Sequence, residues 1–127
     1  MRKLAWGDPL AMKSGSRSTY VPDRGDIVKL NFSPQVGHEQ AGFRPALILS
    51  PAKYNKLSSL ALMCPITNQA KGYRFEVLLG DSVETSGVVL SDQVKSFDWR
   101  SRQVKFVEQA PAGLVDEVLA KIATLLE

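Results

Sequence analysis

Short apolar runs, separated by turn residues, make up most of the chain after residue 20. Residues 26–32 alternate imperfectly between apolar and polar side chains, which is typical of a half-buried strand. Residues 44–50 and 60–66 are nearly continuous apolar runs bounded by prolines, which indicates core strands of a strongly bent sheet. Further short strands are expected at 74–79, 87–90 and 103–107. This spacing predicts a mainly β fold, either a small antiparallel barrel or a sandwich.

The periodicity changes near the C-terminus. After Pro111, apolar side chains recur at Leu114, Val118, Ile122 and Leu125, and charged residues stand between them. This helical spacing predicts an amphipathic α-helix over the last sixteen residues. We expect the helix to cover one end of the barrel, and docking onto a partner is the alternative.

The first nineteen residues show no sustained periodicity and end in a Ser/Gly/Arg run. They predict a flexible basic extension at 1–19, ahead of one folded domain at 20–127. The extension holds four basic residues and one acidic residue, which accounts for the whole net charge of +3. Because the remaining chain is balanced, any anion-binding surface on the domain must come from local clustering of its charges.

Composition and rare residues exclude several classes of protein. With 127 residues, 44 % of them hydrophobic, the chain has the size of one globular domain and lacks an apolar run long enough for a membrane helix. The single cysteine, Cys64, excludes an internal disulfide and favours a reducing cytoplasm. Its apolar neighbours predict a buried thiol, with a reactive one as the alternative. With His38 as the single histidine, neither a metal cluster nor a Ser-His-Asp triad can be assembled around spaced histidines.

Three loops contain groups that suit a phosphodiester, which needs cations, hydroxyl or amide donors and a proton acceptor. The candidates are Glu39, Gln40 and Arg44 in the first loop, Thr67, Asn68, Gln69 and Lys71 in the second, and Gln93, Lys95, Arg100 and Arg102 in the third.

Arg44 is the most informative candidate. It is a planar cation with five N–H donors, and Pro45 restricts the backbone beside it. A structural salt bridge or a strand-edge charge is the alternative role for this arginine. Thr67 ends an apolar run, where its hydroxyl could either cap a turn or point into a site.

The third loop interleaves the aromatic residues Phe97 and Trp99 with four basic residues. Single-stranded nucleic acid stacks its bases on aromatic side chains and pairs its phosphates with cations. The alternative is a solvated hairpin whose Trp99 packs into the core or into a dimer interface.

Four short motifs together resemble those of the MazF/PemK (Kid, ChpB) endoribonuclease toxins of type II toxin–antitoxin systems. They are G-D at 25–26, E-Q-x-G-x-R-P at 39–45, P-x-T at 65–67 and D-Q-V-K at 92–95. The resemblance covers residues 20–127 in the same order, and its specificity comes from the combination of the motifs.

The resemblance implies a small SH3-like antiparallel barrel of the CcdB/MazF kind with a C-terminal helix, and a homodimer. It also implies cleavage of single-stranded RNA without a metal or other cofactor, giving a 2′,3′-cyclic phosphate and a 5′-OH. A MazE/PemI-like antitoxin, through a disordered acidic segment, would cover the RNA-binding groove. Two alternatives are a gyrase poison like CcdB and a catalytically silent domain that binds RNA or antitoxin.

Carried over residue by residue, the resemblance implies catalytic roles for Arg44 and Thr67, with Glu39 as the base and Lys71 in support. Certain members have a histidine where this chain has Phe43, so Glu39 or water must serve as the base if one is required. The loops expected to read RNA bases are 33–43, 52–59, 67–73 and 92–102, which include the substrate-binding candidates Gln40, Asn68, Gln69, Lys71, Gln93, Lys95 and Arg100.

Overall fold

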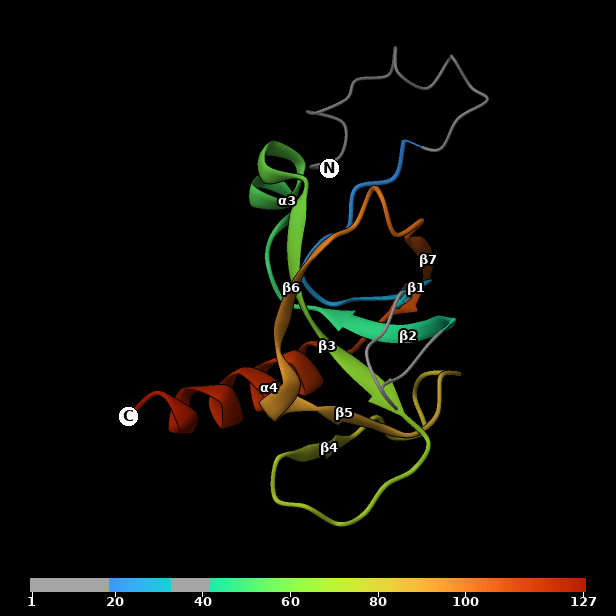
Figure 1. Cartoon of the computed structure of the whole chain (residues 1–127). Helices are drawn as coiled ribbons and strands as arrows, with labels where there is room; N and C mark the ends of the chain where they lie inside the picture. The colour runs from blue at the N-terminus through green and yellow to red at the C-terminus, as the bar shows by residue number, and fades with distance from the viewer. Residues whose placement is uncertain (1–18, 33–41) are drawn as a thin grey trace.

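A computed structural model describes residues 19–32 and 42–127. Its elements are β1 (Asp26–Asn31), β2 (Phe43–Ile48), α3 (Ala52–Ser58), β3 (Leu60–Thr67), β4 (Glu76–Leu78), β5 (Val88–Leu90), the 3-10 turn η1 (Ser91–Gln93), β6 (Lys95–Asp98), β7 (Lys105–Gln109) and α4 (Ala112–Leu125) (Figure 1). Within this part of the chain no helix is long and apolar enough to cross a membrane.

The strands form an antiparallel sheet in which β3 occupies the central position. The strand order is β4-β5-β3-β2-β1-β7, and β6 pairs with β3 outside this path. Met63 of β3 pairs with Ile48 of β2 on one side and with Lys95 of β6 on the other. The predicted mainly β fold with a C-terminal helix is confirmed, and the backbone ladder is an open path with β4 and β7 at its ends.

The sheet separates two apolar cores because successive strand residues point to opposite faces. Ile27, Leu47 and Cys64 belong to the first core, which also receives α4. Ala46 and Met63 belong to the second core, on the other face. Figure 1 shows α4 lying across one end of the sheet, with its C-terminal end projecting beyond the strands. Strands β2 and β3 are therefore each anchored by buried side chains on both faces of the sheet.

The C-terminal helix agrees with its predicted spacing over most of its length. Pro111 stands at its N-cap, and Leu114 and Val118 are buried in the first core. Leu125 and Leu126 are exposed, since the last turn extends past the sheet. The helix thus covers one end of the sheet, as expected, and leaves an apolar tip uncovered.

Residues 52–59, which we expected to form a loop, instead contain the helix α3. Its N-cap is Pro51, and the amide of Ala52 donates to the Asp23 carboxylate over 2.8 Å. The only buried residue of α3 is polar Asn55, so the helix has no apolar stripe from which it could be predicted.

The third loop of the sequence interpretation likewise contains a strand, β6, and Trp99, which follows this strand directly, packs inward. Trp99 is only 4 % exposed and belongs to the second core, and its indole N–H donates to the carbonyl of Asn55 over 3.0 Å. The structure therefore decides for the core alternative, and Trp99 is unavailable as a stacking surface for bases.

Candidate functional site

The ends of β2 and β3 bring Arg44 and Thr67 to one end of the sheet. The register of the two strands pairs Ala46 with Pro65. Antiparallel partners point to the same face, and side chains two positions apart along a strand share a face. The side chains of Arg44 and Thr67 therefore share the face of the Ala46–Pro65 pair, each two residues beyond it.

The backbone of β2 holds Arg44 in place. This exposed residue is paired in register with Leu30 of β1, which is fully buried. Phe43, beside it, is exposed and has the Lys105 ammonium group 5.7 Å from its ring centroid. Phe43 thus takes part in a cation–π contact at the position where certain family members have a histidine.

Thr67 is half-buried and has a partly engaged hydroxyl. Its Oγ1 accepts a hydrogen bond from the amide of Gln69 over 3.1 Å, as in a turn cap. A threonine hydroxyl that accepts one bond retains its own O–H for donation. The turn-capping and substrate-contacting roles considered from the sequence are therefore compatible with one another.

The start of β5 lies directly against the Thr67 backbone. Gly87 has φ +114°, and an added Cβ there would stand 2.2 Å from the carbonyl oxygen of Thr67. The preceding Ser86 donates its hydroxyl to Oδ1 of Asn68 over 2.8 Å. These contacts hold the Thr67–Asn68 segment. The sequence analysis placed Gly87 at the start of a strand but did not assign Ser86 or Gly87 to the site, although a Ser-Gly pair is a recognisable turn signal.

The second loop is organised by Glu76 of β4. Its carboxylate accepts the amides of Lys71, over 3.0 Å to Oε2, and of Gly72, over 2.9 Å to Oε1. Asn68, Gln69 and Lys71 are exposed on this loop. Three of the predicted substrate-binding residues therefore follow Thr67 within four positions of the chain, on a loop that the Glu76 carboxylate ties to the sheet.

The third-loop candidates lie farther from Thr67. Lys95 pairs with Met63 near the middle of β3, and Asp98 pairs with Leu60 at the strand's other end. At about 3.3 Å per residue, β3 separates Thr67 from its first residue by up to about 23 Å. Arg100 follows Asp98, so a single chain does not bring Arg100 to the end where Arg44 and Thr67 meet.

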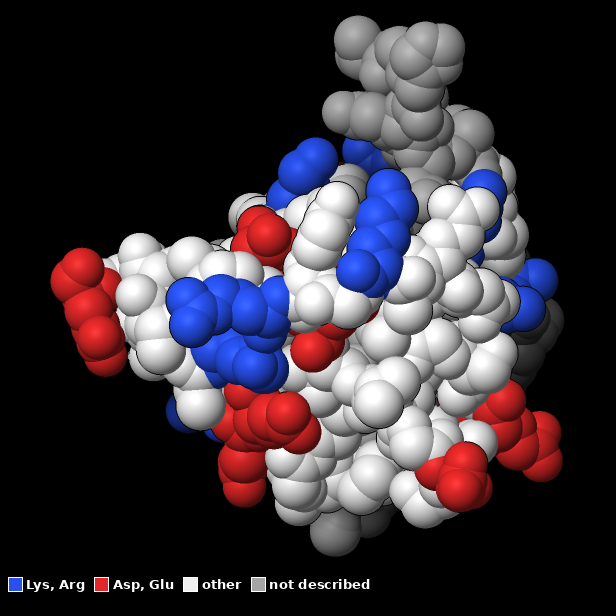
Figure 2. Space-filling model, turned by 90° about the horizontal axis from the view of Figure 1, so that it is seen from below, with Lys and Arg blue, Asp and Glu red and all other residues white. Residues whose placement is uncertain are grey.

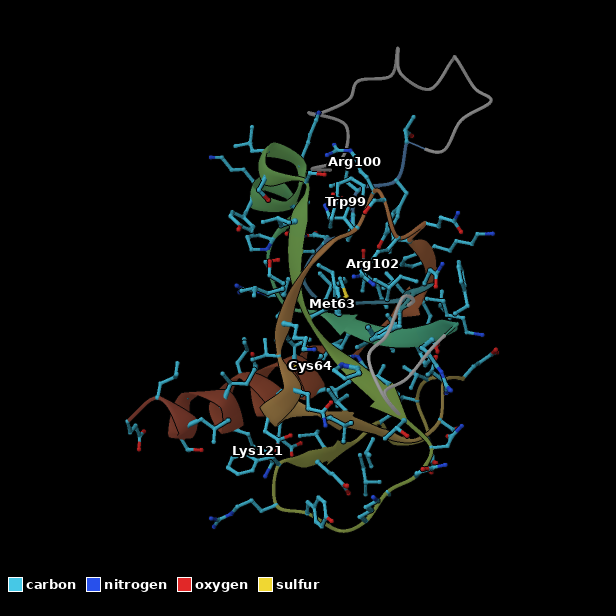
Figure 3. All side chains as sticks on the ribbon, viewed as in Figure 1. Met63, Cys64, Trp99, Arg100, Arg102 and Lys121 are labelled. Atoms are coloured by element: carbon cyan, nitrogen blue, oxygen red, sulfur yellow. The ribbon has the colours of Figure 1, made fainter. Side chains whose placement is uncertain are left out.

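Two of the basic residues in this region cover the aromatic side chains instead. The guanidinium carbon of Arg100 lies 4.3 Å from the ring centroid of Trp99, and that of Arg102 lies 4.6 Å from the ring centroid of Phe97. Figure 3 shows Arg100 and Trp99 near α3, away from the end of β3 where its arrow points. Gln93, in η1, is exposed.

Two predicted residues, Glu39 and Gln40, lie outside the described residues, as does His38. Their assignment as base and substrate contact remains a prediction.

Cys64 is buried, as its sequence neighbours predicted. Burial raises the pKa of its thiol to about 12, with a smaller contribution from the negative charge of Asp92. Its Sγ lies 3.9 Å from the carbonyl oxygen of Ser91. The thiol is therefore a packed, protonated group at neutral pH.

Charges on the molecule are mixed. Figure 2, viewed from below, shows separate groups of Lys and Arg side chains among Asp and Glu side chains on that face. This agrees with the charge balance of residues 20–127.

Fold and site together define a small antiparallel β protein that carries an arginine and a threonine at one end of adjacent core strands. The model of the PemK-like, MazF-like toxins of type II toxin–antitoxin systems matches residues 23–126, and the chain belongs to this family.

Relatives with similar sequences and structures carry the same family name. The endoribonuclease toxin MazF of Escherichia coli K12 is 53 % identical over 85 residues, which are 67 % of this chain and 76 % of that protein. A crystal structure of MazF from Deinococcus radiodurans has a TM-score of 0.79 at 54 % identity, covering 84 % of this chain and 97 % of that one. The MazE–MazF structure from the same organism has a TM-score of 0.76 at 48 % identity, covering 84 % and 96 %.

Proposed function

We propose that this chain is an endoribonuclease toxin that cuts single-stranded RNA at short sequence motifs without a metal or other cofactor. The observation that carries the proposal is the shared face and shared strand end of Arg44 and Thr67. An arginine and a hydroxyl at one end of a rigid sheet suit a phosphodiester, because they stabilise developing charge without rearranging. The names of the curated relatives, which are endoribonucleases, support the same activity.

In the proposed reaction the ribose 2′-oxygen attacks the adjacent phosphorus. The 2′-oxygen forms a bond to phosphorus as its proton leaves to a base, and the 5′-oxygen departs and gains a proton, which gives a 2′,3′-cyclic phosphate and a 5′-OH. The nucleophile is already tethered next to its target, so positioning supplies much of the rate. Arg44 stabilises negative charge on the phosphoryl oxygens, and the Thr67 hydroxyl donates a hydrogen bond to one of them.

The base of this reaction is assigned to Glu39, because Phe43 provides no imidazole. Substrate contacts are assigned to a further set of polar and basic side chains: Gln40, Asn68, Gln69, Lys71, Gln93, Lys95 and Arg100. Bases of single-stranded RNA would be splayed out against these loops, where hydrogen bonds to their edges select the sequence. Arg100 would contact RNA at a distance from the scissile phosphate, given its position at the far end of β3.

A homodimer is part of the proposal. Leu60 and Leu62 lie two positions apart on β3, so they share a face, and both are exposed. Large exposed apolar side chains that lie together indicate an interface. Light scattering of the wild type and of the Leu62→Lys variant tests this assignment: a dimer that the variant splits supports it, and a monomeric wild type would refute it.

Neutralisation in the cytoplasm by a MazE/PemI-like antitoxin completes the proposal. The MazE–MazF structure of the Deinococcus radiodurans relative supports such a partner. An acidic segment would compete with RNA phosphates for Arg44 and neighbouring cations.

The chemistry of the product ends tests the proposal. An unstructured RNA is incubated with the protein in EDTA, and the downstream fragments are then treated with polynucleotide kinase without prior phosphatase. We expect direct labelling, since the proposed cleavage leaves a 5′-OH. Fragments that require phosphatase first, or RNA that is bound and left intact, would overturn the mechanism.

A further inference from the structure

The Glu108 side chain connects β7, at one end of the strand order, with the loop between β4 and β5 near the other end. β5 and β7 do not pair with each other through the backbone. The Glu108 carboxylate of β7 instead accepts three hydrogen bonds from the loop that precedes β5. The amide of Glu84 donates to Oε1 over 3.0 Å, and the amide and hydroxyl of Thr85 donate to Oε2 over 2.7 and 2.6 Å.

The same loop leads directly to the candidate site. Immediately after Thr85, Ser86 donates to the side chain of Asn68, and Gly87 packs against the carbonyl of Thr67 with no room for a Cβ. Val88, the next residue, pairs in register with Thr67. The segment from Thr85 to Val88 is therefore fixed to β7 at one end and presses on the Thr67 strand end at the other.

We propose that Glu108 is a positioning residue of the cleavage site: it fixes the 84–87 loop and through it the orientation of Thr67 and Asn68. This inference rests on the proposed function, since it gives the Thr67 hydroxyl a role in cleavage. Glu108 itself touches no reacting group and acts through the loop.

We call the three hydrogen bonds from Glu84 and Thr85 to the Glu108 carboxylate the latch. The latch requires a carboxylate at position 108. Three donors converge on its two oxygens, and ionised carboxylates accept such bonds strongly. These bonds lower the pKa of Glu108, the Thr85 hydroxyl contributing most. A glutamine at this position keeps one acceptor oxygen but turns an N–H₂ group toward remaining donors, so at least one of the three bonds is lost.

Steady-state cleavage of a single-stranded RNA by the full-length chain, with the RNA in excess, tests the role. We expect Glu108→Gln to lower kcat on the order of 10-fold with little change in KM, because a small displacement of a group that acts in the transition state is costly. Glu84→Gln removes a negative charge from the same loop but keeps the backbone amide that donates to Glu108, and its own carboxylate accepts none of the latch bonds, so this variant is the matched control and should cleave like the wild type.

Replacement of Thr85 is a second test of the latch, from the donor side. Thr85→Val should lower kcat, whereas Thr85→Ser, which keeps the hydroxyl, should have a kcat close to that of the wild type. The double variant Thr85→Val/Glu108→Gln should have a kcat no lower than that of the slower single variant, since both changes break the same latch. Equal kcat in all folded variants, or strictly additive losses, would overturn the proposal.

Backbone amide NMR shifts separate this inference from the proposed function. Glu108→Gln should shift the amides of Thr67, Asn68 and Gln69, and Glu84→Gln should not. Shifts confined to residues 84–85 and 105–109 would show that the latch does not reach the site. This result holds whether or not the wild type cleaves RNA, so failure of the two proposals can be told apart.

Discussion

Arg44 and Thr67 are chemically complementary, because one supplies a permanent positive charge and the other a hydroxyl donor. In the sequence they are separated by more than twenty residues, and each also has an ordinary structural role open to it. The register of β2 and β3 gives them a shared face at one strand end. That arrangement, and not either residue alone, is what supports a site for a phosphodiester.

Replacement of Thr67 tests the role of its hydroxyl. Thr67→Val keeps the shape of the side chain but removes both the O–H donor and the acceptor of the Gln69 amide. We expect kcat for RNA cleavage to fall about 10²–10³-fold, as for other lost donors to a developing oxyanion. Thr67→Ser should retain most activity. An active Thr67→Val protein, together with a loss of activity in Thr67→Ser, would indicate that the methyl group matters and the hydroxyl does not.

The thiol of Cys64 should be inert in the folded protein. With a pKa of about 12 caused mainly by burial, almost no thiolate exists at pH 8, and the side chain is closed off from reagents. A thiol-specific reagent should react with the protein only after denaturant is added. Rapid stoichiometric labelling of the native protein at pH 8 would contradict this assignment.

At the scale of elements, a polar network centred on Asn55 ties α3 to the sheet. Asn55 is fully buried, and its Nδ2 donates to the carbonyls of Pro22 and Ser50 over 2.7 and 2.9 Å. Its Oδ1 accepts the Ser50 hydroxyl over 2.6 Å. The Asn55 side-chain nitrogen thus donates two hydrogen bonds and its oxygen accepts one. Polar groups that are satisfied in this way form a stable buried network.

Truncation of Asn55 should destabilise the fold. Asn55→Ala leaves buried carbonyls and a hydroxyl without their partner, so we expect the free energy of unfolding to drop by about 2–4 kcal/mol. Lys53→Ala on the exposed side of the same helix should change it by less than about 0.5 kcal/mol. Urea unfolding followed by circular dichroism measures both, and a loss under 1 kcal/mol for Asn55→Ala would contradict the network's importance.

The latch between β7 and the loop before β5 should be sensitive to acid. The folded-state pKa of Glu108 lies below its usual 4.5, so its contribution to stability is fully present above about 4.5 and is lost as the pH falls through the folded pKa. The difference in urea midpoint between the wild type and Glu108→Gln should therefore be larger at pH 7 than at pH 3. The same difference at both pH values would mean that the charge does not stabilise the latch.

At the scale of the whole molecule, apolar periodicity predicted the core strands and α4, because these elements bury whole side-chain faces. It missed α3, whose buried residue is polar, and it assigned β6 to a loop, because that short strand carries mostly polar side chains. The burial of Trp99 also depended on pairing between distant segments.

The site was only partly predictable for the same reason. Local sequence and family resemblance identified Arg44 and Thr67, but their shared face follows from the pairing of two strands. The contacts of Ser86, Gly87 and Glu108 join segments far apart in the sequence, so no local pattern predicts them. Glu39 and Gln40 remain predictions.

Cleavage of an unstructured RNA in EDTA by the wild type and by Arg44 variants tests whether Arg44 is a catalytic residue. We predict cleavage at defined short motifs by the wild type, a loss of about 10³-fold or more for Arg44→Ala, and an intermediate rate for Arg44→Lys, which keeps the charge but not the planar fork. Melting curves establish that the variants are folded. An Arg44→Ala protein that folds normally and cleaves at the wild-type rate would show that Arg44 has no part in cleavage.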